Sequence, residues 1–466
     1  MASGSNSTLW RDLRDAVSGA ERDFTREPLK RAILLLAVPM VLEMCMESLF
    51  GIVNIFWVAR LGPDAVAGVG LTESMLTILY SVALGVSMAT TAMIARRTGE
   101  QNSEGASIAA VQAILLGLLL SLVVGVPGVI HARDLLRLMG AEPGVVEHGA
   151  AYTAILLGTS PSIMLLFLMN AIFRGAGDAA IAMRVLWAAN LLNMALDPCL
   201  IYGLGPFPEL GVAGAAVATS ISRSFGVCLQ LAVFFRARGR VTVARRHLRV
   251  DFGILRRLSR ISATGMLQFL IAHASWVGLV RVIAASGSAA LAGYTIALRI
   301  IIFSILPSWG LANAAATLVG QNLGARHPER AEESVWKCGF YNMLFLGLIG
   351  AVFIVVPGPL IRLFSTEPTV VRYGADCLRV MSYGYVFYAY GMVMVQAFNG
   401  AGDTVTPTII NLGCYWCLQI PLAWLLAVHW QLGAHGAFWA VPLAESVLAV
   451  TGVLVFRRGS WKKQKI

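Results

Sequence analysis

Two apolar stretches of this chain carry acidic and amide side chains at spacings that place them on one face of a helix. Between residues 32 and 58, Glu43, Glu47 and Asn54 fall within about 40° of one another at helical periodicity. Two acids four residues apart would repel each other if both were ionised, so one of them must hold a proton or share a cation. The pattern therefore favours proton coupling, with a helix-packing hydrogen-bond stripe as the alternative.

The second polar face lies between residues 181 and 204. Asn190, Asn193 and Asp197 are spaced three and four apart, and Pro198 frees a backbone carbonyl nearby. Thr219, in the next apolar stretch, adds a hydroxyl group. A carboxylate with amide and carbonyl oxygens suits a proton or a hard cation such as Na⁺. The alternative is a kinked helix in which Asp197 pairs with an arginine.

Such groups are informative because the chain around them is so apolar. Of 466 residues, 57% are hydrophobic and 13% are charged, and the mean hydropathy is +0.72. These values predict an all-α integral membrane protein that crosses the bilayer many times. The polar interruptions leave about twelve apolar runs of membrane-spanning length. We place them near 32–58, 68–94, 107–130, 150–173, 181–204 and 211–235, and then near 259–285, 290–319, 336–358, 377–399, 407–428 and 434–456.

The second half of the sequence repeats the first. Gly62 returns as Gly287, since 287 − 62 = 225, and the same offset relates Gly99 to Gly324. In the last third the register moves by three residues, because the loop before Gly211 is longer than its counterpart. Six spans are an even number, so the two six-helix repeats are parallel and are related by a pseudo-two-fold axis along the membrane normal.

Basic residues set the expected orientation and the domain boundaries. We expect an N-terminal segment (1–30), an N-lobe (31–235), a linker (236–258), a C-lobe (259–456) and a tail (457–466). The linker region is rich in arginine: Arg236, Arg238, Arg240, Arg245, Arg246, Arg249, Arg256, Arg257 and Arg260. The positive-inside rule then places the linker and both termini in the cytoplasm and the protein in the inner membrane. No aromatic residues alternate with these arginines, so a nucleic-acid partner is not expected.

No enzyme signature is present in the sequence. It contains no HExxH, GxSxG or Walker A motif, and its histidines are scattered. We therefore expect neither catalysis nor a cofactor, and an ion gradient must supply any work of transport. No metal site is predicted apart from possible Na⁺ binding at Asp197 and Asn193.

Charges of opposite sign occupy related positions in the two halves. Arg223 has Glu445 as its counterpart, and Glu73 and Arg299 are one residue out of register. These two reversals of charge indicate either electrostatic complementarity between the halves or ion pairs within one half. Gln268 stands where the repeat places Glu43, so any ion site is expected in the N-terminal half.

Candidate substrate contacts are therefore residues with polar or adaptable side chains in spans one, two, seven, eight and ten. Span ten is rich in aromatic residues and methionine, which form a packed core or a surface for flat cations. The set comprises Asn54, Glu73, Gln268, Arg299, Tyr388 and Met392.

The chain resembles the multidrug and toxic compound extrusion (MATE) transporters over nearly its whole length. The resemblance is carried by VPMVLEMCMESLFGIVNIFWVARLGPDAVAGVG, the glycine loops around Gly99 and Gly324, the paired GAGD loops, and NMALDP followed by GVAGAAVAT. It implies two six-helix lobes around a central cleft, and a cation site formed by Asp197, Asn193, Asn190 and Thr219. Family members commonly have an aspartate where this chain has Asn54, so Glu43 or Glu47 would take that role.

The expected function is export of an amphiphilic, cationic small molecule by a monomer in the lipid bilayer. Alternating access would exchange it for H⁺ or Na⁺, and the crowding of Glu43 and Glu47 favours H⁺. A flippase for lipids or lipid-linked oligosaccharides is the alternative, since Arg184, Arg223, Arg281 and Arg299 would suit a basic cleft. A membrane-embedded enzyme is disfavoured by the missing catalytic motifs.

Overall fold

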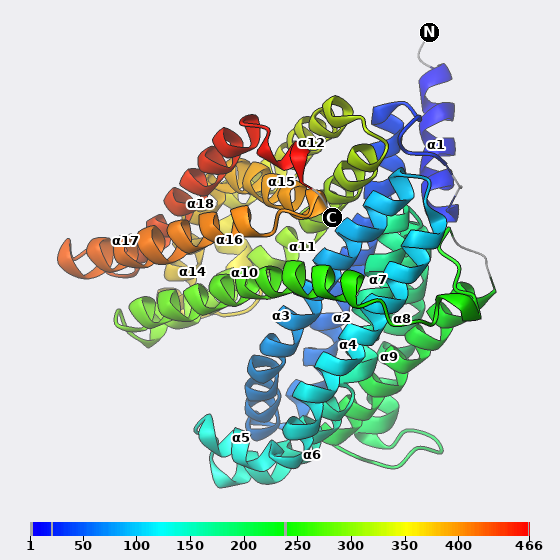
Figure 1. Ribbon diagram of the computed structural model, residues 1–466. Helices are drawn as coiled ribbons and strands as arrows, with labels where there is room; N and C mark the ends of the chain where they lie inside the picture. The colour runs from blue at the N-terminus through cyan, green and yellow to red at the C-terminus, as the bar shows by residue number, and fades with distance from the viewer. Residues whose placement is uncertain (1–2, 20–21, 237–239, 465) are drawn as a thin grey trace.

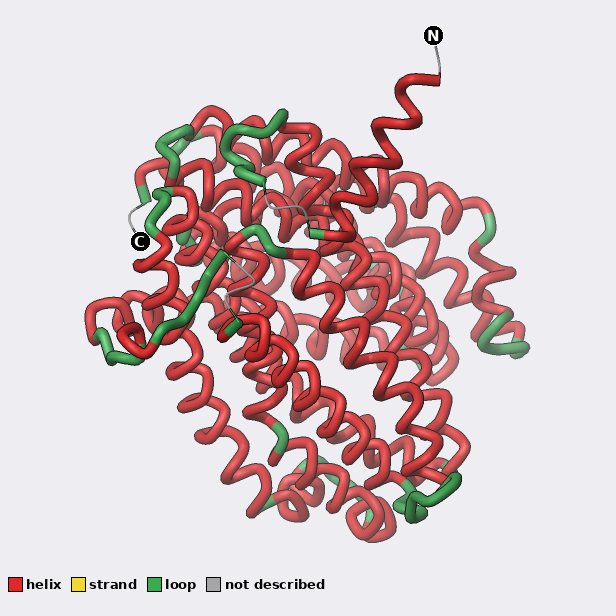
Figure 2. The backbone as a smooth tube through the Cα atoms, turned by 90° about the vertical axis from the view of Figure 1, so that its right-hand side faces the viewer, coloured by secondary structure: helices red, strands yellow, loops and turns green. Residues whose placement is uncertain are grey.

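The structure is a computed structural model that describes residues 3–19, 22–236, 240–464 and 466. Arg238 of the linker and Lys465 of the tail lie outside the described residues. Across the described chain, helices follow one another with short connecting loops, and no strand occurs (Figure 2). The predicted all-α class is confirmed.

The first repeat follows an N-terminal helix, α1 (Ser3–Ser18). It consists of α2 (Leu29–Val58), α3 (Pro63–Gly99), α4 (Ser103–Ile130), α5 (Ala132–Leu138), α6 (Pro143–Gly158), α7 (Ser160–Ala176), α8 (Ala179–Tyr202) and α9 (Val212–Phe235). The second repeat contains α10 (Phe252–Ala284), α11 (Ser288–Gly324), α12 (Pro328–Val355), α13 (Pro357–Arg362), α14 (Pro368–Tyr383), α15 (Tyr385–Ala401), α16 (Val405–Asn411), α17 (Ile420–Trp424) and α18 (Ala434–Arg457). Two π-helical segments, Leu412–Gln419 and Leu425–His429, make α16 and α17 part of one continuous span.

The sequence repeat is also a repeat of secondary structure. Helix α3 and helix α11 begin at 63 and 288 and end at 99 and 324, so both ends differ by 225. The same offset relates both ends of α4 and α12, of α6 and α14, and of α7 and α15. The loops match too: Gly62 and Gly287 have φ of 106° and 104°, a region that favours glycine. Two parallel six-helix repeats are therefore confirmed.

Two of the spans are broken rather than continuous. Within the described residues, ten helices are long and apolar enough to cross a membrane, and the pair α6 and α7, bent by 44°, makes an eleventh. The pair α14 and α15 is its repeat counterpart, so the repeat assigns it as the twelfth span, although α14 is less apolar than the other spans. Spans four and ten were expected near 150–173 and 377–399, but each is longer and breaks midway. Pro161 in the first turn of α7 has no N–H to continue the preceding helix.

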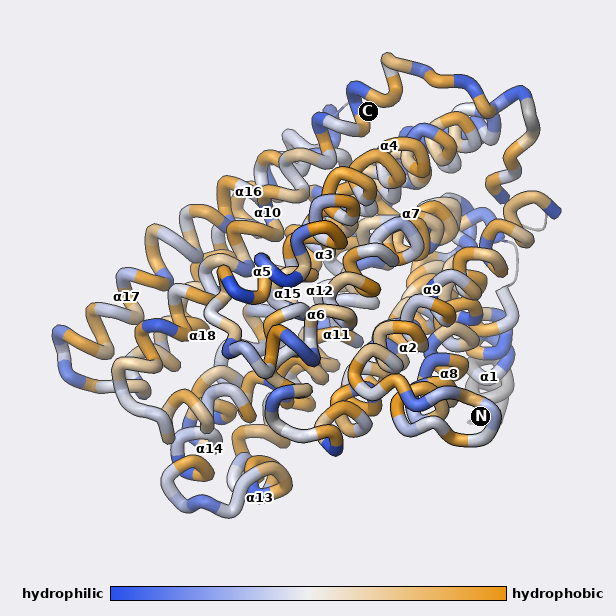
Figure 3. The backbone as a smooth tube through the Cα atoms, turned by 90° about the horizontal axis from the view of Figure 1, so that it is seen from below, coloured by the Kyte–Doolittle hydropathy of each residue, from blue (hydrophilic) through white to orange (hydrophobic). Residues whose placement is uncertain are grey.

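The two helical bundles diverge from a common end. In Figure 1, α3, α4 and α9 run downward while α10, α16 and α18 run to the left, and the C-terminus and α1 lie near the join. Separate apolar cores fill the first and second repeats. A third core at the join combines α1, α2, α11, α12 and α15 with the buried Trp461 of the tail. Seen from below, apolar residues recur along outer helices such as α4, α16 and α17, as lipid contact requires (Figure 3).

The repeats touch through small residues on their symmetry axis. Ala95 of α3 and Gly320 of α11 are repeat counterparts, since 320 − 95 = 225, and a Cβ added at Gly320 would lie 2.6 Å from that of Ala95. A residue can meet its own counterpart only on the axis that relates the repeats. Nearby, Gln321 Nε2 donates to the Gly175 carbonyl at 2.9 Å, and Thr317 Oγ1 to the Arg174 carbonyl at 3.3 Å. The shared end of the bundles is therefore closed.

Adding a methyl group on this axis should destabilise the join. We expect Gly320→Ala to lower the melting temperature of the detergent-purified protein, because overpacking costs about 1–3 kcal/mol. Gly70→Ala on α3 is the matched control, because a Cβ there has nothing within 4 Å and alanine favours helix by up to about 1 kcal/mol. Equal melting temperatures for the two variants would refute the close axial contact.

Candidate functional site: a cavity between the repeats and a buried carboxylate

A cavity of about 410 Å³ opens between the two repeats beyond their contact. Helices α2, α3, α7, α8 and α9 of the first repeat form one side, and α10, α11 and α15 of the second form the other. Gly400, Ala316 and Thr317, which belong to the closed join, also line the cavity. The join is therefore its floor.

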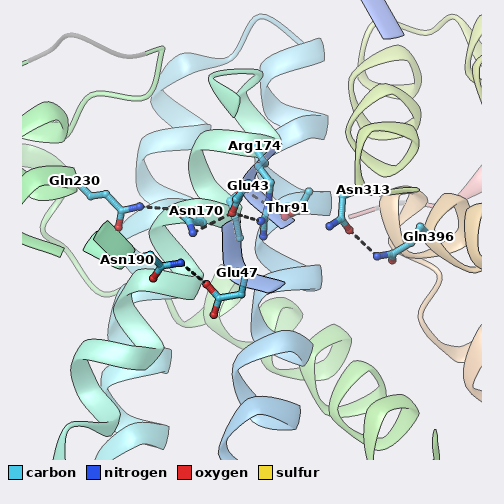
Figure 4. Close-up of polar contacts among 10 residues, drawn as sticks. Glu43, Glu47, Thr91, Asn170, Arg174, Asn190, Gln230, Asn313 and Gln396 are labelled. Atoms are coloured by element: carbon cyan, nitrogen blue, oxygen red, sulfur yellow. Dashed lines mark hydrogen bonds and ion pairs between the residues drawn. The ribbon is translucent and has the colours of Figure 1, made fainter. Parts of the chain in front are cut away.

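One wall carries a buried ion pair. Arg174 donates to Glu43 Oε1 at 2.9 Å, and the Asn170 amide donates to the same oxygen at 3.1 Å. Gln230 in turn donates to Asn170 Oδ1 at 2.5 Å (Figure 4). Glu43 is 1% exposed, and such a carboxylate persists in an apolar environment because its partners satisfy its charge.

A second ion pair lies one turn further along α2. Arg223 of α9 donates to Glu47 Oε1 at 2.8 Å, and Asn190 of α8 donates to Oε2 at 3.0 Å. Each of the two acids of the predicted stripe thus has its own arginine. The arginines offset the repulsion between the two carboxylates, so the acids need not share one cation. Glu43 and Glu47 both line the cavity, whereas Asn190 acts through Glu47.

The facing wall carries neutral amides and aromatic rings. Gln396 of α15 donates to Asn313 Oδ1 of α11 at 2.7 Å, and Asn399 donates to Gln396 Oε1 at 3.0 Å. Phe269 of α10 and Trp309 of α11 stack with their ring centroids 5.7 Å apart and their planes at 15°. Figure 4 shows Asn313 and Gln396 across the gap from the acidic wall.

Asp197 lies apart from the cavity lining, in the interior of the first repeat. It is fully buried, and Asn54 of α2 donates to its Oδ2 at 3.3 Å. Its Oδ1 has no hydrogen-bond partner, and Asp197 forms no ion pair with any described residue. A buried carboxylate with a free oxygen and no arginine can bind a proton or a small cation.

Asn193, on the same face of α8 as Asp197, lies in a cluster of amide and hydroxyl groups with residues of α9. Asn193 donates to Thr219 Oγ1 at 3.2 Å and to Ser222 Oγ at 3.0 Å, and its own Oδ1 has no partner. Asn193 and Thr219 therefore lie together, as predicted, while Asn190 turns toward Glu47. The six predicted coupling residues therefore form two groups: Asp197, Asn193 and Thr219, and Glu43, Glu47 and Asn190. Helix α2 takes part in both, because it carries the two glutamates and the Asn54 that contacts Asp197.

The remaining candidates do not line this cavity. Glu73 and Arg299 are exposed, and the charge of Arg299 on α11 acts on Glu73 on α3 across the two repeats. Gln268 is buried, and Met392 accepts from Ser308 at 3.6 Å inside the second repeat. Tyr388 packs in the core of that repeat. A substrate role for these residues and for Asn54 stays a prediction.

Sequence reasoning missed Asn170 and Arg174. They are four residues apart in an apolar stretch, the same signal that identified Glu43 and Glu47. It also missed Asn399, although the repeat marks it as the counterpart of Arg174, since 399 − 174 = 225. Glu445, seen before only as the counterpart of Arg223, is a buried acid of the second repeat that accepts from Tyr415 at 3.1 Å.

Comparison with known proteins places this arrangement in a family. The MatE family model matches residues 39–199 and 266–425, one stretch in each repeat. The chain is a member of the MatE family. It is a multi-pass membrane transporter.

Relatives match over almost the full length. The chain is 26% identical to the probable multidrug resistance protein NorM of Thermotoga maritima over 441 residues, 94% of each chain. It is 25% identical to the FAD transporter of Shewanella oneidensis over 426 residues, covering 91% of this chain and 93% of that one. A solved outward-facing multidrug resistance MATE family transporter superposes with a TM-score of 0.89 at 28% identity, covering 95% and 98%.

The Glu43–Arg174 pair offers a test of the cavity wall. We expect Arg174→Gln to destabilise the protein by about 3–5 kcal/mol, because it leaves the Glu43 carboxylate buried without its counter-ion. The double variant Glu43→Gln/Arg174→Gln should recover most of the loss in thermal melting. Lys337→Gln breaks the exposed Lys337–Glu333 pair instead and should cost under about 1 kcal/mol. A double variant no more stable than Arg174→Gln would contradict the pairing.

Proposed function

We propose that this MatE family member is a secondary active efflux transporter, which exports amphiphilic cationic compounds in exchange for H⁺ or Na⁺. The observation that carries the proposal is Asp197, a buried carboxylate with a free oxygen inside the first repeat, on a helix that packs against the cavity-lining helix α2. The multidrug resistance proteins among the relatives support the export of drug-like small molecules. We favour H⁺, because a proton needs a single free carboxylate oxygen.

The expected orientation makes this conformation open to the outside. The closed end carries α1 and the tail, and Arg240 of the arginine-rich linker donates to Asp178 and to the Ala176 carbonyl near the join. The positive-inside rule assigns these segments to the cytoplasm. In this state, a drug that entered from the cytoplasm would leave through the diverging ends. Return to the inward-facing state would require the repeats to rock about their axial contact.

Helix α2 connects the cation site to the substrate cavity. Its Asn54 donates to Asp197, and its Glu47 and Glu43 form the cavity wall. A cation at Asp197 replaces or weakens the Asn54 contact and so changes how α2 packs on α8. The same helix would then shift both glutamates, so cation and substrate would favour opposite states by about 1–3 kcal/mol of coupling.

Asp197→Asn should abolish coupling without unfolding the protein. In everted vesicles, we expect ethidium uptake by the wild type under a pH gradient or a Na⁺ gradient imposed alone, and its loss in Asp197→Asn. Asp134→Asn, at an exposed carboxylate on α5, is the control and should transport normally. Undiminished gradient-driven uptake by Asp197→Asn would rule out this residue as the coupling site.

We propose that Glu73 and Arg299 help to close the outer mouth in the inward-facing state. They lie on α3 and α11, one from each repeat, and are exposed but not in direct contact in this state. Rocking of the repeats would bring them together. We expect Glu73→Arg and Arg299→Glu each to reduce ethidium uptake several-fold and the charge-swapped double variant to recover it. No recovery in a folded double variant would argue against this gate.

The flippase alternative depends on a basic cleft, and the contacts of the cavity arginines do not support it. Arg174 and Arg223 are each bound to a glutamate rather than free for a phosphate group. Efflux of amphiphilic small molecules is therefore the better proposal.

A further inference from the structure

We propose that the cavity selects substrates by unsubstituted N–H groups at one end of a flat aromatic body, rather than by positive charge as such. The N–H groups would bind at Glu43 and Asn399, near the floor where the repeats meet. This inference names the substrate class of the proposed efflux site and rests on that proposal.

Two residues that line the cavity, one on each side, carry a buried acceptor atom without a partner. Glu43 Oε2 on the first repeat and Asn399 Oδ1 on the second have no hydrogen-bond partner, and the side chains are 1% and 2% exposed. Both are oxygens that only accept, and each belongs to a side chain already fixed by another contact: Glu43 by Arg174 and Asn399 by Gln396. A buried acceptor gains about 1–3 kcal/mol from a donor, so a ligand with N–H groups is favoured here.

The charge balance of the lining does not favour cations in general. Glu43 pairs with Arg174 and Glu47 with Arg223, so the four charged side chains of the acidic wall sum to zero. A permanently charged cation without N–H groups would meet a neutral wall and leave both acceptors unpaired. Discrimination must then come from hydrogen bonds, which penalise a ligand that buries an acceptor without pairing it.

The aromatic part of the cavity suits a flat ring system. Phe269 and Trp309 stack almost parallel, and Phe50 and Phe167 line the first repeat's side. Such faces bind planar rings through offset stacking and apolar burial. A flat tricyclic body with an exocyclic amino group therefore satisfies both parts of the site.

Proflavine and acridine orange separate this hypothesis from simple hydrophobic binding. Both are flat cationic acridines, but proflavine has two exocyclic NH₂ groups where acridine orange has two N(CH₃)₂ groups. Apolar burial alone favours the methylated dye, so the two explanations predict opposite orders of affinity for the two dyes. Fluorescence anisotropy of each dye with the full-length detergent-purified protein should give at least about tenfold tighter binding of proflavine.

Variants at Asn399 assign the preference to its side-chain oxygen. In Asn399→Ala the preference for proflavine should fall to about twofold, while Asn399→Asp, which keeps an acceptor, should retain it. Asn411→Ala is the matched control, since Asn411 Oδ1 is also buried and unpartnered but does not line the cavity. Its preference should match the wild type. Equal loss in Asn399→Ala and Asn411→Ala would overturn the assignment.

Comparing the two dyes on the wild-type protein tests the inference without any substitution. Acridine orange binding as tightly as proflavine or more tightly would overturn the inference. Gradient-driven uptake of both dyes at equal rates in everted vesicles would also overturn it, while leaving the efflux function intact. Selective binding of proflavine without uptake under either ion gradient would refute the efflux function and leave the binding inference standing.

Discussion

The rest of this molecule depends on the close contact of helices α3 and α11 on the axis that relates the repeats. Ala95 lies against its own counterpart, Gly320, and Gly99 lies beside Gly324. Small residues let the two backbones approach, as in other packed membrane helices. With the bundles held together at this end and diverging from it, the space between them becomes the cavity. This axial contact is flanked by two symmetry-related ones, Gly85 of α3 against Met266 of α10 and Gly310 of α11 against Met40 of α2. Because it lies on the symmetry axis, it can also serve as a pivot about which two similar bundles rock.

Buried charge explains how the first repeat could combine a substrate wall with a cation site. Two glutamates on α2 are matched by Arg174 and Arg223, so the wall is neutral and its side chains are fixed. Asp197 instead has an amide from Asn54 and a free oxygen. An arginine partner stabilises a buried carboxylate charge, whereas a buried carboxylate without such a partner is left able to bind a cation. The difference in partners, rather than in residue type, separates the two proposed roles.

Much of the fold could be predicted because its signals are local or periodic. Apolar runs gave the spans, and the 225-residue offset gave the parallel repeats. The partners of the acids could not be predicted in the same way: Glu43 meets Arg174 across 131 residues, and helical periodicity gives the face of a helix but not the helix that packs on it. The stripe of Glu43 and Glu47 was therefore interpreted as mutual repulsion, although each acid has an arginine on another helix. The breaks in spans four and ten were missed because the apolar runs predicted near 150–173 and 377–399 continue across both of them.

The central claim is that the repeats rock about the axial contact when the cation site is occupied. Pulsed electron spin resonance on reconstituted protein tests it most directly, with spin labels at two pairs of exposed repeat counterparts. Leu138→Cys and Leu363→Cys report the open end, and Glu104→Cys and Glu329→Cys report the closed end, with the exposed Cys228 and Cys417 replaced by serine. On changing pH or adding Na⁺, the account predicts that the distance between labels shortens at one end and lengthens at the other. Distances that stay constant at both ends, or change in the same direction, would contradict it.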